Sequence, residues 1–336
     1  MALRLPGFTR ASSLGPIAMF LDAHGSSVGR VLETVDLPFA IIEQPEIVVP
    51  LREQFRFLES AARDVGDPCF GARLGQAVKA QELSAFGAWI CTADTLAAGI
   101  QRAHAGISAM LQTSTLLTLS RHGSFVRWSI AFVEPESEGR HHNEFLGLGY
   151  MISLVRAYAG AGWRPNLVMS ALPRGTPSAE LEEIFGTNVS HGHAVPAIDF
   201  EARLLAVSPL VTADGRVEAS SNEPTMPGPN DLVATVASVI ELALHDGYPR
   251  VEWVASKLGL TRRSLQRRLH EQGAMFNHIT ENLLKRRAEV LLGQGDAAVT
   301  EVALMLGYAD PAHFTRAFRR WTGMTPSQFR AEVRNH

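Results

Sequence analysis

Near its C-terminus the chain reads Val251-Glu252-Trp253-Val254-Ala255-Ser256-Lys257-Leu258-Gly259-Leu260, and further on Thr300-Glu301-Val302-Ala303-Leu304-Met305-Leu306-Gly307-Tyr308. The small Ala and the Gly four residues after it recur at the same spacing. The Ala lets two helices approach closely, and the Gly supplies the positive φ that ends a helix. An amphipathic segment rich in Arg follows each stretch. The pattern therefore predicts two helix-turn-helix units in tandem.

The second helix of each unit begins at a residue suited to an N-cap. Thr261 takes this place in the first unit and Asp310 in the second, where Pro311 follows at the first helical position. Helical spacing places an apolar pair of side chains on one face of each helix, so the opposite face is free to meet DNA. The candidates for base contacts on these faces are Arg262, Arg263, Gln266, Arg267, Ala312, His313, Thr315 and Arg316.

Phosphate contacts are expected from a second set of cations. They would supply affinity that is independent of sequence and falls with salt. The candidates are Arg268, Lys285, Arg319 and Arg320. The alternative interpretation of each unit is an ordinary helical pair whose Arg side chains are solvated, because short motifs produce false matches. Two copies with matching small, Gly, apolar and Arg positions favour DNA binding.

These residues resemble the DNA-binding domain of the AraC/XylS family of transcription regulators. The resemblance runs from about Asn230 to the C-terminus, and its most specific part is Gly307-Tyr308-Ala309-Asp310-Pro311-Ala312-His313-Phe314-Thr315-Arg316-Ala317-Phe318-Arg319-Arg320-Trp321-Thr322-Gly323-Met324-Thr325-Pro326-Ser327-Gln328-Phe329-Arg330. It implies a seven-helix domain in which a long helix, about Ala274 to Gly293, joins the two units. It also implies base contacts at the candidates above except His313, which comes from the helix-face argument alone.

Charge is divided unevenly along the chain. The 336 residues carry a net charge of −3, but residues 250–336 hold 14 Lys plus Arg against 8 Asp plus Glu, a net of +6. Residues 1–249 hold 17 against 26. A basic module attached to an acidic domain is typical of proteins that bind a polyanion through one part of the chain.

The composition favours a protein of the cytoplasm with two domains. No apolar run is long enough to cross a bilayer, and the N-terminus lacks the layout of a signal peptide. Cys69 and Cys91 are too few for a disulfide framework. We expect them to be core thiols, with a redox-sensing pair as the alternative.

The predicted fold class is α+β, with a mixed N-terminal sensor or dimerisation domain and an all-helical C-terminal domain. A Pro-, Ser- and Gly-rich stretch marks the boundary. The expected limits are 8–215 for the first domain, 216–230 for the linker and 231–336 for the DNA-binding domain. Within the first domain, periodicity predicts helices over 51–65, 96–111 and 144–162, a hairpin of 115–120 with 125–133, and strands over 166–172 and 196–203.

The N-terminal region resembles the ligand-binding-like domain of the AraC-type branch that includes the ornithine-utilisation regulator. The residues that carry this resemblance are Asp67-Pro68-Cys69-Phe70-Gly71-Ala72-Arg73-Leu74-Gly75, Ser84-Ala85-Phe86-Gly87 and Thr92-Ala93-Asp94-Thr95-Leu96. It implies a shared fold and no particular effector. The cupin-like barrel of other AraC-type proteins is not apparent, because the first hundred residues are mainly helical in pattern.

Catalysis and metal binding find little support in the sequence. His141-His142 and His191-Gly192-His193 lie in polar stretches without the spacing of a zinc motif, so we interpret them as solvated loop histidines. Ser120 and His122 lack a context for nucleophilic catalysis. We expect no metal, no cofactor and no enzymatic activity.

The favoured hypothesis is a sequence-specific transcription regulator that binds double-stranded promoter DNA. Its N-terminal domain would respond to a small-molecule effector or form a homodimer, and RNA polymerase would be a further partner if the protein activates transcription. No membrane partner is expected. The alternative is an enzyme-like N-terminal domain that the C-terminal domain targets to DNA.

Overall fold

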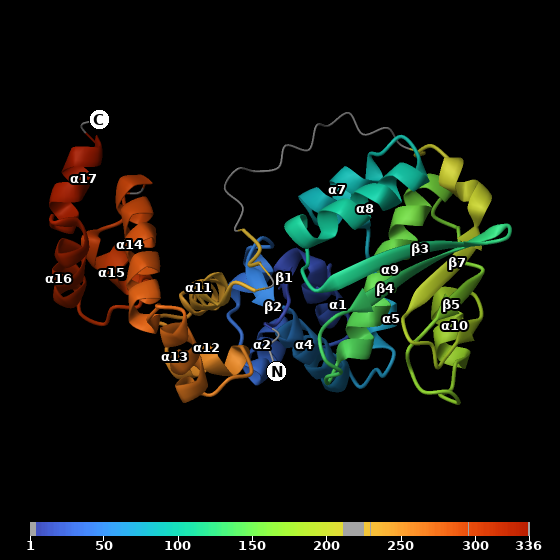
Figure 1. Cartoon of the computed structure of the whole chain (residues 1–336), viewed down its shortest axis with the longest axis horizontal. Helices are drawn as coiled ribbons and strands as arrows, with labels where there is room; N and C mark the ends of the chain where they lie inside the picture. The colour runs from blue at the N-terminus through green and yellow to red at the C-terminus, as the bar shows by residue number, and fades with distance from the viewer. Residues whose placement is uncertain (1–4, 211–224, 229, 295, 335–336) are drawn as a thin grey trace. The chain divides into compact units, whose positions relative to one another are not determined.

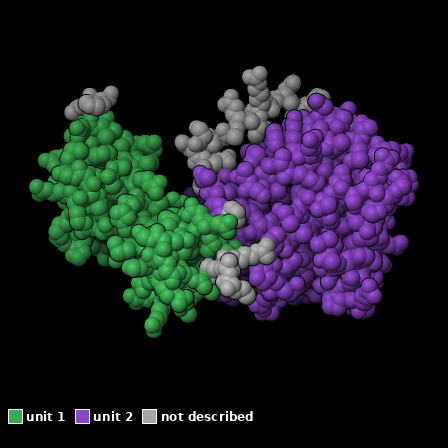
Figure 2. Space-filling model, viewed as in Figure 1, with its two compact units in different colours: residues 1–5, 230–336 green, residues 6–229 purple. Residues whose placement is uncertain are grey.

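The computed structural model describes residues 5–210, 225–228, 230–294 and 296–334. The chain divides into two compact units, one of residues 6–229 and one of residues 230–336 together with Leu5 (Figure 2). All strands within the described ranges belong to the first unit, and the second is helical (Figure 1). The predicted α+β class is confirmed. Most of the predicted linker, residues 216–224 and 229, lies outside the described residues, so the domain limits stay a prediction.

The first unit begins with helices and a two-stranded sheet and continues into a five-stranded sheet with a long helix. Its elements are β1 (Phe8–Arg10), the 3-10 helix η1 (Ala11–Leu14), α1 (Ile17–Ala23), α2 (Val28–Val35), α3 (Ala40–Glu43), β2 (Val48–Pro50), α4 (Leu51–Val65), α5 (Phe70–Ala77), α6 (Ala80–Leu83), α7 (Ala85–Cys91), α8 (Leu96–Met110), β3 (Thr115–His122), β4 (Phe125–Phe132), α9 (Arg140–Ala159), β5 (Leu167–Met169), α10 (Ala179–Phe185), β6 (Val189–Ser190), β7 (Ala197–Glu201) and the 3-10 helix η2 (Ala202–Ala206).

The larger sheet has the strand order β3-β4-β7-β5-β6. Strands β3 and β4 form the predicted hairpin, with Thr115 opposite Phe132 and His122 opposite Phe125. Its two-residue turn contains Gly123, whose φ of 64° lies in the left-handed region that glycine tolerates best. Along β4, alternate residues are buried because a strand points successive side chains to opposite faces.

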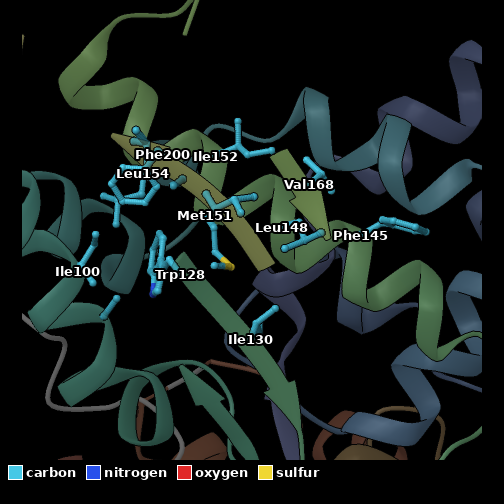
Figure 3. Close-up of a cluster of buried hydrophobic side chains, with 14 of the residues drawn as sticks. Ile100, Trp128, Ile130, Phe145, Leu148, Met151, Ile152, Leu154, Val168 and Phe200 are labelled. Atoms are coloured by element: carbon cyan, nitrogen blue, oxygen red, sulfur yellow. The ribbon is translucent and has the colours of Figure 1, made fainter. Parts of the chain in front are cut away.

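Helix α9 supplies much of the core that covers this sheet. Trp128 and Ile130 of β4 and Phe200 of β7 share one buried cluster with Met151 and Leu154 of α9 (Figure 3). Many residues around the whole circumference of α9 are buried. Such a helix is apolar on every side because it is packed on every side.

Glycines set the close contact between α5 and α9. A Cβ atom on Gly71 would lie 2.2 Å from the carbonyl oxygen of His142, and one on Gly149 would lie 2.4 Å from the Cα of Gly75. Neither distance is possible without a backbone shift. The Gly-rich stretch that carried the N-terminal resemblance thus serves helix packing.

The interpretation of His141 and His142 as loop histidines was wrong. Helix α9 begins at Arg140, four residues before the predicted start, so both lie in its first turn. His142 is 2% exposed. The polar composition of 140–144 concealed the helix, because its charged side chains pair with each other in the fold, as Arg140 does with Glu144 at 2.8 Å.

The second unit contains seven helices within the described residues, as the family resemblance implied. Asp231 caps the first of them by accepting a hydrogen bond from the N–H of Ala234 at 2.8 Å, as predicted. The helices are α11 (Leu232–Ala243), α12 (Val251–Lys257), α13 (Arg262–Glu271), α14 (Phe276–Gln294), α15 (Val299–Met305), α16 (Pro311–Thr322) and α17 (Pro326–Arg334). Helix α14 is the predicted connecting helix, and it packs against α11, α15, α16 and α17.

Replacing Gly149 with Ala is expected to lower the free energy of unfolding of the first unit by about 1–3 kcal/mol, because backbone atoms must move to admit the methyl group. Gly162→Ala is the matched control, since nothing lies within 4 Å of a Cβ there. Chemical denaturation of the full chain, followed by circular dichroism, measures both. Equal unfolding midpoints for the two variants would contradict this account of the contact.

Candidate nucleic-acid interface

Helices α12 and α13 form the first predicted helix-turn-helix unit. Ala255 is 1% exposed, and Gly259 has a φ of 66° at the turn. The hydroxyl of Thr261 accepts a hydrogen bond from the N–H of Ser264 at 3.2 Å and so caps α13. The roles predicted for these three residues are confirmed.

Helices α15 and α16 repeat this arrangement. Ala303 is fully buried, and Gly307 has a φ of 77°. Asp310 caps α16 by accepting a hydrogen bond from the N–H of Ala312 at 2.8 Å, and Pro311 is the first residue of that helix. The two units therefore share the same local chemistry at the small residue, the turn and the cap.

Each second helix buries one face and exposes the other. Leu265 and Leu269 of α13 and Phe314 and Phe318 of α16 are each 0% exposed. The exposed residues on the opposite faces include most of the predicted contacts, namely Arg262, Arg263, Gln266, Arg267, Ala312, His313, Arg316, Arg319 and Arg320.

Three predicted contact residues are only half-exposed. The hydroxyl of Thr315 donates a hydrogen bond to the carbonyl of Pro311 at 3.0 Å, so its hydrogen is engaged within α16. Arg268 is partly buried, and its Nη1 atom has no hydrogen-bond partner among the described residues. Lys285 lies on α14, and its Nζ is 3.9 Å from a carboxylate oxygen of Glu289.

Carboxylates hold several of the arginines on these faces. Arg262 pairs with Glu252 of α12 at 2.8 Å, and Arg267 lies 3.7 Å from Glu271. In the second helix-turn-helix unit, Oδ2 of Asp310 lies 4.0 Å from both Nη2 of Arg316 and Nε2 of His313. Arg320 pairs with Glu281 of α14. Arg263 and Arg319 form no ion pair within the described part of the chain.

These exposed pairs contribute little stability, on the order of 0–1 kcal/mol each. They orient the guanidinium groups, and a phosphate or base edge is able to displace the carboxylates at small cost. Sequence reasoning missed them. The spacing of Arg267 and Glu271 was a usable signal, but the partners of Arg262 and Arg320 come from other helices and are set by the fold.

A column of aromatic rings runs from the loop after α11, through the second helix-turn-helix unit, to α17. Tyr248 contacts Tyr308 with ring centroids 5.9 Å apart, and Tyr308 contacts Phe314 at 5.6 Å. The column continues through Phe318 to Phe329 of α17. Since Tyr248 precedes α12, this column connects the start of the first helix-turn-helix unit to the recognition helix of the second.

The N-terminal compact unit, residues 6–229, contains a cavity among strands β3 and β4 and helices α7, α8 and α9. Its empty space is about 700 Å³ including the open mouth. The walls include Trp128, Ile130, Met151 and Leu154, which Figure 3 shows within the core. Most of the residues that line the cavity are apolar, as is usual for small-molecule sites.

Two groups of side chains have the composition of metal ligands. One contains Glu59, His141 and His142. Burial, with a smaller effect of His141, lowers the pKa of His142 to about 3, so its ring is neutral at neutral pH. The second group contains Asp67, Cys69 and Glu180. Burial raises the pKa of Cys69 to about 11, so its thiol keeps its proton.

The two cysteines and the second pair of histidines were also singled out in the sequence. Cys69 and Cys91 are buried free thiols, as predicted. His191 and His193 follow β6 in a loop, where they hydrogen-bond to Ser170 and Ser190. In the described part of the chain, no helix has the length and apolar character needed to cross a membrane.

Comparison with known proteins matches both units. The family described as "Arabinose-binding domain of AraC transcription regulator, N-term" matches residues 25–208, and a "Helix-turn-helix domain" family matches residues 254–332. The HTH-type transcriptional regulator VirS of Mycobacterium tuberculosis is 25% identical over 98% of each chain. The ornithine utilization regulator of Pseudomonas aeruginosa is 27% identical over 48% of each chain. The crystal structure of the transcriptional regulator CdpR from P. aeruginosa covers 79% of this chain and 87% of its own, at 21% identity and a TM-score of 0.39.

Replacing Gly307 with Ala should destabilise the second unit more than replacing Gly323. Both glycines have φ near 80°, so each Ala costs about 1–2 kcal/mol of backbone strain. Only at Gly307 would the new Cβ also meet a backbone atom, the nitrogen of Tyr248 at 2.2 Å, whereas Gly323 faces open space. Thermal unfolding of the two full-length variants measures the difference. A Gly323→Ala loss equal to that of Gly307→Ala would show that the Tyr248 contact has no energetic role.

Proposed function

The chain belongs to the AraC family of transcription regulators, and on that premise we propose that it reads two successive major-groove segments of promoter DNA, one with each helix-turn-helix unit. The observation that carries this proposal is the repetition of one geometry. Both units have a buried small residue, a glycine turn, a side-chain cap and a second helix with one buried and one exposed cationic face. A single copy of that geometry would suit many roles, but two copies joined by α14 suit a tandem reader.

We assign sequence readout to the residues near the start of each recognition helix. Arg suits the paired acceptors of guanine, and Gln suits the donor and acceptor of adenine. The side chains of α13 at these positions are Arg262, Arg263, Gln266 and Arg267, and those of α16 are Ala312, His313, Arg316 and the half-exposed Thr315. The second set is less polar, so we expect it to rely more on thymine methyl groups and DNA shape.

Phosphate contacts are assigned to Arg268, Lys285, Arg319 and Arg320. Their position beyond the start of the helices and on α14 suits the DNA backbone more than base edges. Affinity should therefore fall steeply as salt rises, because each contact releases condensed counterions.

Selection of bound genomic fragments by the purified protein, followed by titration of the best fragment at several salt concentrations, tests the function. Enrichment of an asymmetric site spanning two major-groove segments is expected. Absence of any enrichment over random DNA, with and without cell-extract metabolites, would contradict sequence-specific reading.

Replacing Arg316 with Ala should weaken binding to the selected site by about 1–3 kcal/mol and leave binding to random DNA nearly unchanged. Replacing Arg319 with Ala on the same helix should weaken binding to both DNAs and reduce the salt slope by about one. Arg267→Ala in α13 is expected to behave like Arg316→Ala. Fluorescence anisotropy with both DNAs measures these effects, and equal losses on the two DNAs for Arg316→Ala would make that residue a phosphate contact.

We propose that the protein is cytoplasmic. Its N-terminal unit, residues 6–229, would control DNA binding by holding a small molecule in its cavity or by forming a homodimer. The cavity and the match to an arabinose-binding family support the first route. Solution mass by light scattering tests the second. RNA polymerase is the further partner if the protein activates transcription, and in vitro transcription with the selected promoter distinguishes activation from repression.

We propose further that the first unit does not catalyse a reaction. Ser120 Oγ and His122 Nε2 lie 2.9 Å apart, but both are on the β3–β4 hairpin away from the cavity, and no carboxylate among the described residues hydrogen-bonds the ring. A nucleophilic serine needs its histidine oriented by a third group. Turnover of a candidate metabolite by the full chain, abolished by His122→Ala or His142→Ala, would establish the alternative of a DNA-targeted enzyme.

A further inference from the structure

The cavity of the first unit has uncharged walls. None of the 21 described residues that line it is Asp, Glu, Lys, Arg or His. Most are aliphatic or aromatic, and the polar members are amides, hydroxyls and the Trp128 indole. The indole N–H is already used, because it donates to Nε2 of His104 at 3.0 Å.

Three of the polar side chains that line the cavity belong to one buried chain of hydrogen bonds. Thr9 and Ser13 hydroxyls lie 2.8 Å apart, Ser13 donates to Oε1 of Gln54 at 2.7 Å, and Gln54 donates to Oδ1 of Asn143 at 2.7 Å. Ser13, Gln54 and Asn143 line the cavity. Within the described residues, the amide nitrogen of Asn143 donates to no protein acceptor, so its N–H groups can donate to one ligand atom.

The second polar cluster at the cavity offers less. Gln112 donates to Thr115 at 2.6 Å, and the Tyr150 hydroxyl donates to the carbonyl of Ser13 at 3.1 Å. These bonds engage the Gln112 amide nitrogen and the Tyr150 hydroxyl hydrogen, so few polar groups of this cluster remain for a ligand. Each further ligand hydroxyl that entered without a partner would cost about 1–3 kcal/mol.

We propose that this cavity binds a neutral, mainly apolar ligand with a single carbonyl or hydroxyl head that accepts a hydrogen bond from Asn143. The inference rests on the proposed small-molecule control and names the chemical class of the effector. A sugar is unsuitable, because its many hydroxyls exceed the available partners. A carboxylate or an ammonium ion is also unsuitable, because no lining residue supplies a counter-charge to offset desolvation.

The test uses the full chain and the fluorescent neutral probe N-phenyl-1-naphthylamine, displaced by decanamide, decanoate, decylammonium or L-arabinose. Decanamide should displace the probe at a concentration at least about tenfold lower than decanoate or decylammonium do, and L-arabinose should not displace it. Equal potency of decanamide and decanoate, displacement by L-arabinose, or failure of the probe to bind would each overturn the proposal.

Adjacent residues of β3 provide a matched pair of variants. Leu117 lines the cavity, whereas Leu116 is 60% exposed on the other face of the strand. Leu117→Arg places a cation at the wall and should reverse the preference, so that decanoate displaces the probe better than decanamide. Leu116→Arg should behave as the unaltered protein does. The same change of preference in both variants would place the probe outside the cavity and overturn the assignment.

Asn143→Leu keeps the test decisive if Leu117→Arg does not fold. It removes the proposed donor, so decanamide should lose about tenfold in potency while binding of the wholly apolar probe persists. An unchanged potency would exclude Asn143 as the head-group donor.

A separate measurement of DNA affinity distinguishes the proposed ligand class from the proposed control of DNA binding by a small molecule. Decanamide that displaces the probe without changing affinity for the selected promoter supports the ligand class and argues against control by this cavity. A metabolite that changes DNA affinity but does not displace the probe supports control and overturns the ligand class.

Discussion

The placement of the two recognition helices depends on a backbone contact between Gly307 and Tyr248. The turn of the second helix-turn-helix unit lies against the loop that precedes α12 of the first, so closely that a Cβ on Gly307 would be 2.2 Å from the Tyr248 nitrogen. The rings of Tyr248 and Tyr308 pack beside this contact. Because DNA presents successive major-groove segments at a fixed repeat, a tandem reader needs such a rigid joint between its units. Position 307 requires glycine for two reasons, its positive φ and the lack of space for a Cβ atom.

Much of the C-terminal helical unit was predictable because its turns and caps depend on interactions between residues close in the sequence. The Gly turns, the Thr261 and Asp310 caps and the apolar pairs act within a few residues, so their pattern in the sequence predicts their geometry directly. The β3–β4 hairpin was predictable for the same reason, since alternation and a Gly turn are local. The base and phosphate assignments follow from exposed faces and stay predictions, because they depend on a DNA partner.

Long-range packing explains what could not be predicted. The strand order β3-β4-β7-β5-β6 and the approach of α5 to α9 bring together residues far apart in the chain. His142 illustrates the point: its sequence neighbours are polar, yet α5 covers it, and Gly71 donates a hydrogen bond to its ring at 3.3 Å. The cavity likewise joins residues from Ser13 to Leu154, and no local pattern indicates its uncharged walls. The pairing of Arg262 with Glu252 also required the fold.

The hydrogen-bond chain at the cavity offers a physical route from ligand binding to a change of state. Thr9, Ser13, Gln54 and Asn143 belong to β1, η1, α4 and α9, so a ligand that engages Asn143 contacts a network spanning four elements. A ligand shifts an equilibrium only by its difference in affinity between two states, and a hundredfold shift needs about 2.7 kcal/mol. One hydrogen bond supplies about 0.5–1.5 kcal/mol of this. Burial of a further ~50–90 Å² of apolar surface supplies the rest, at about 25 cal/mol per Å². An effector for this cavity therefore needs an apolar body that fits one state better than the other, since its head group alone is too weak to control DNA binding.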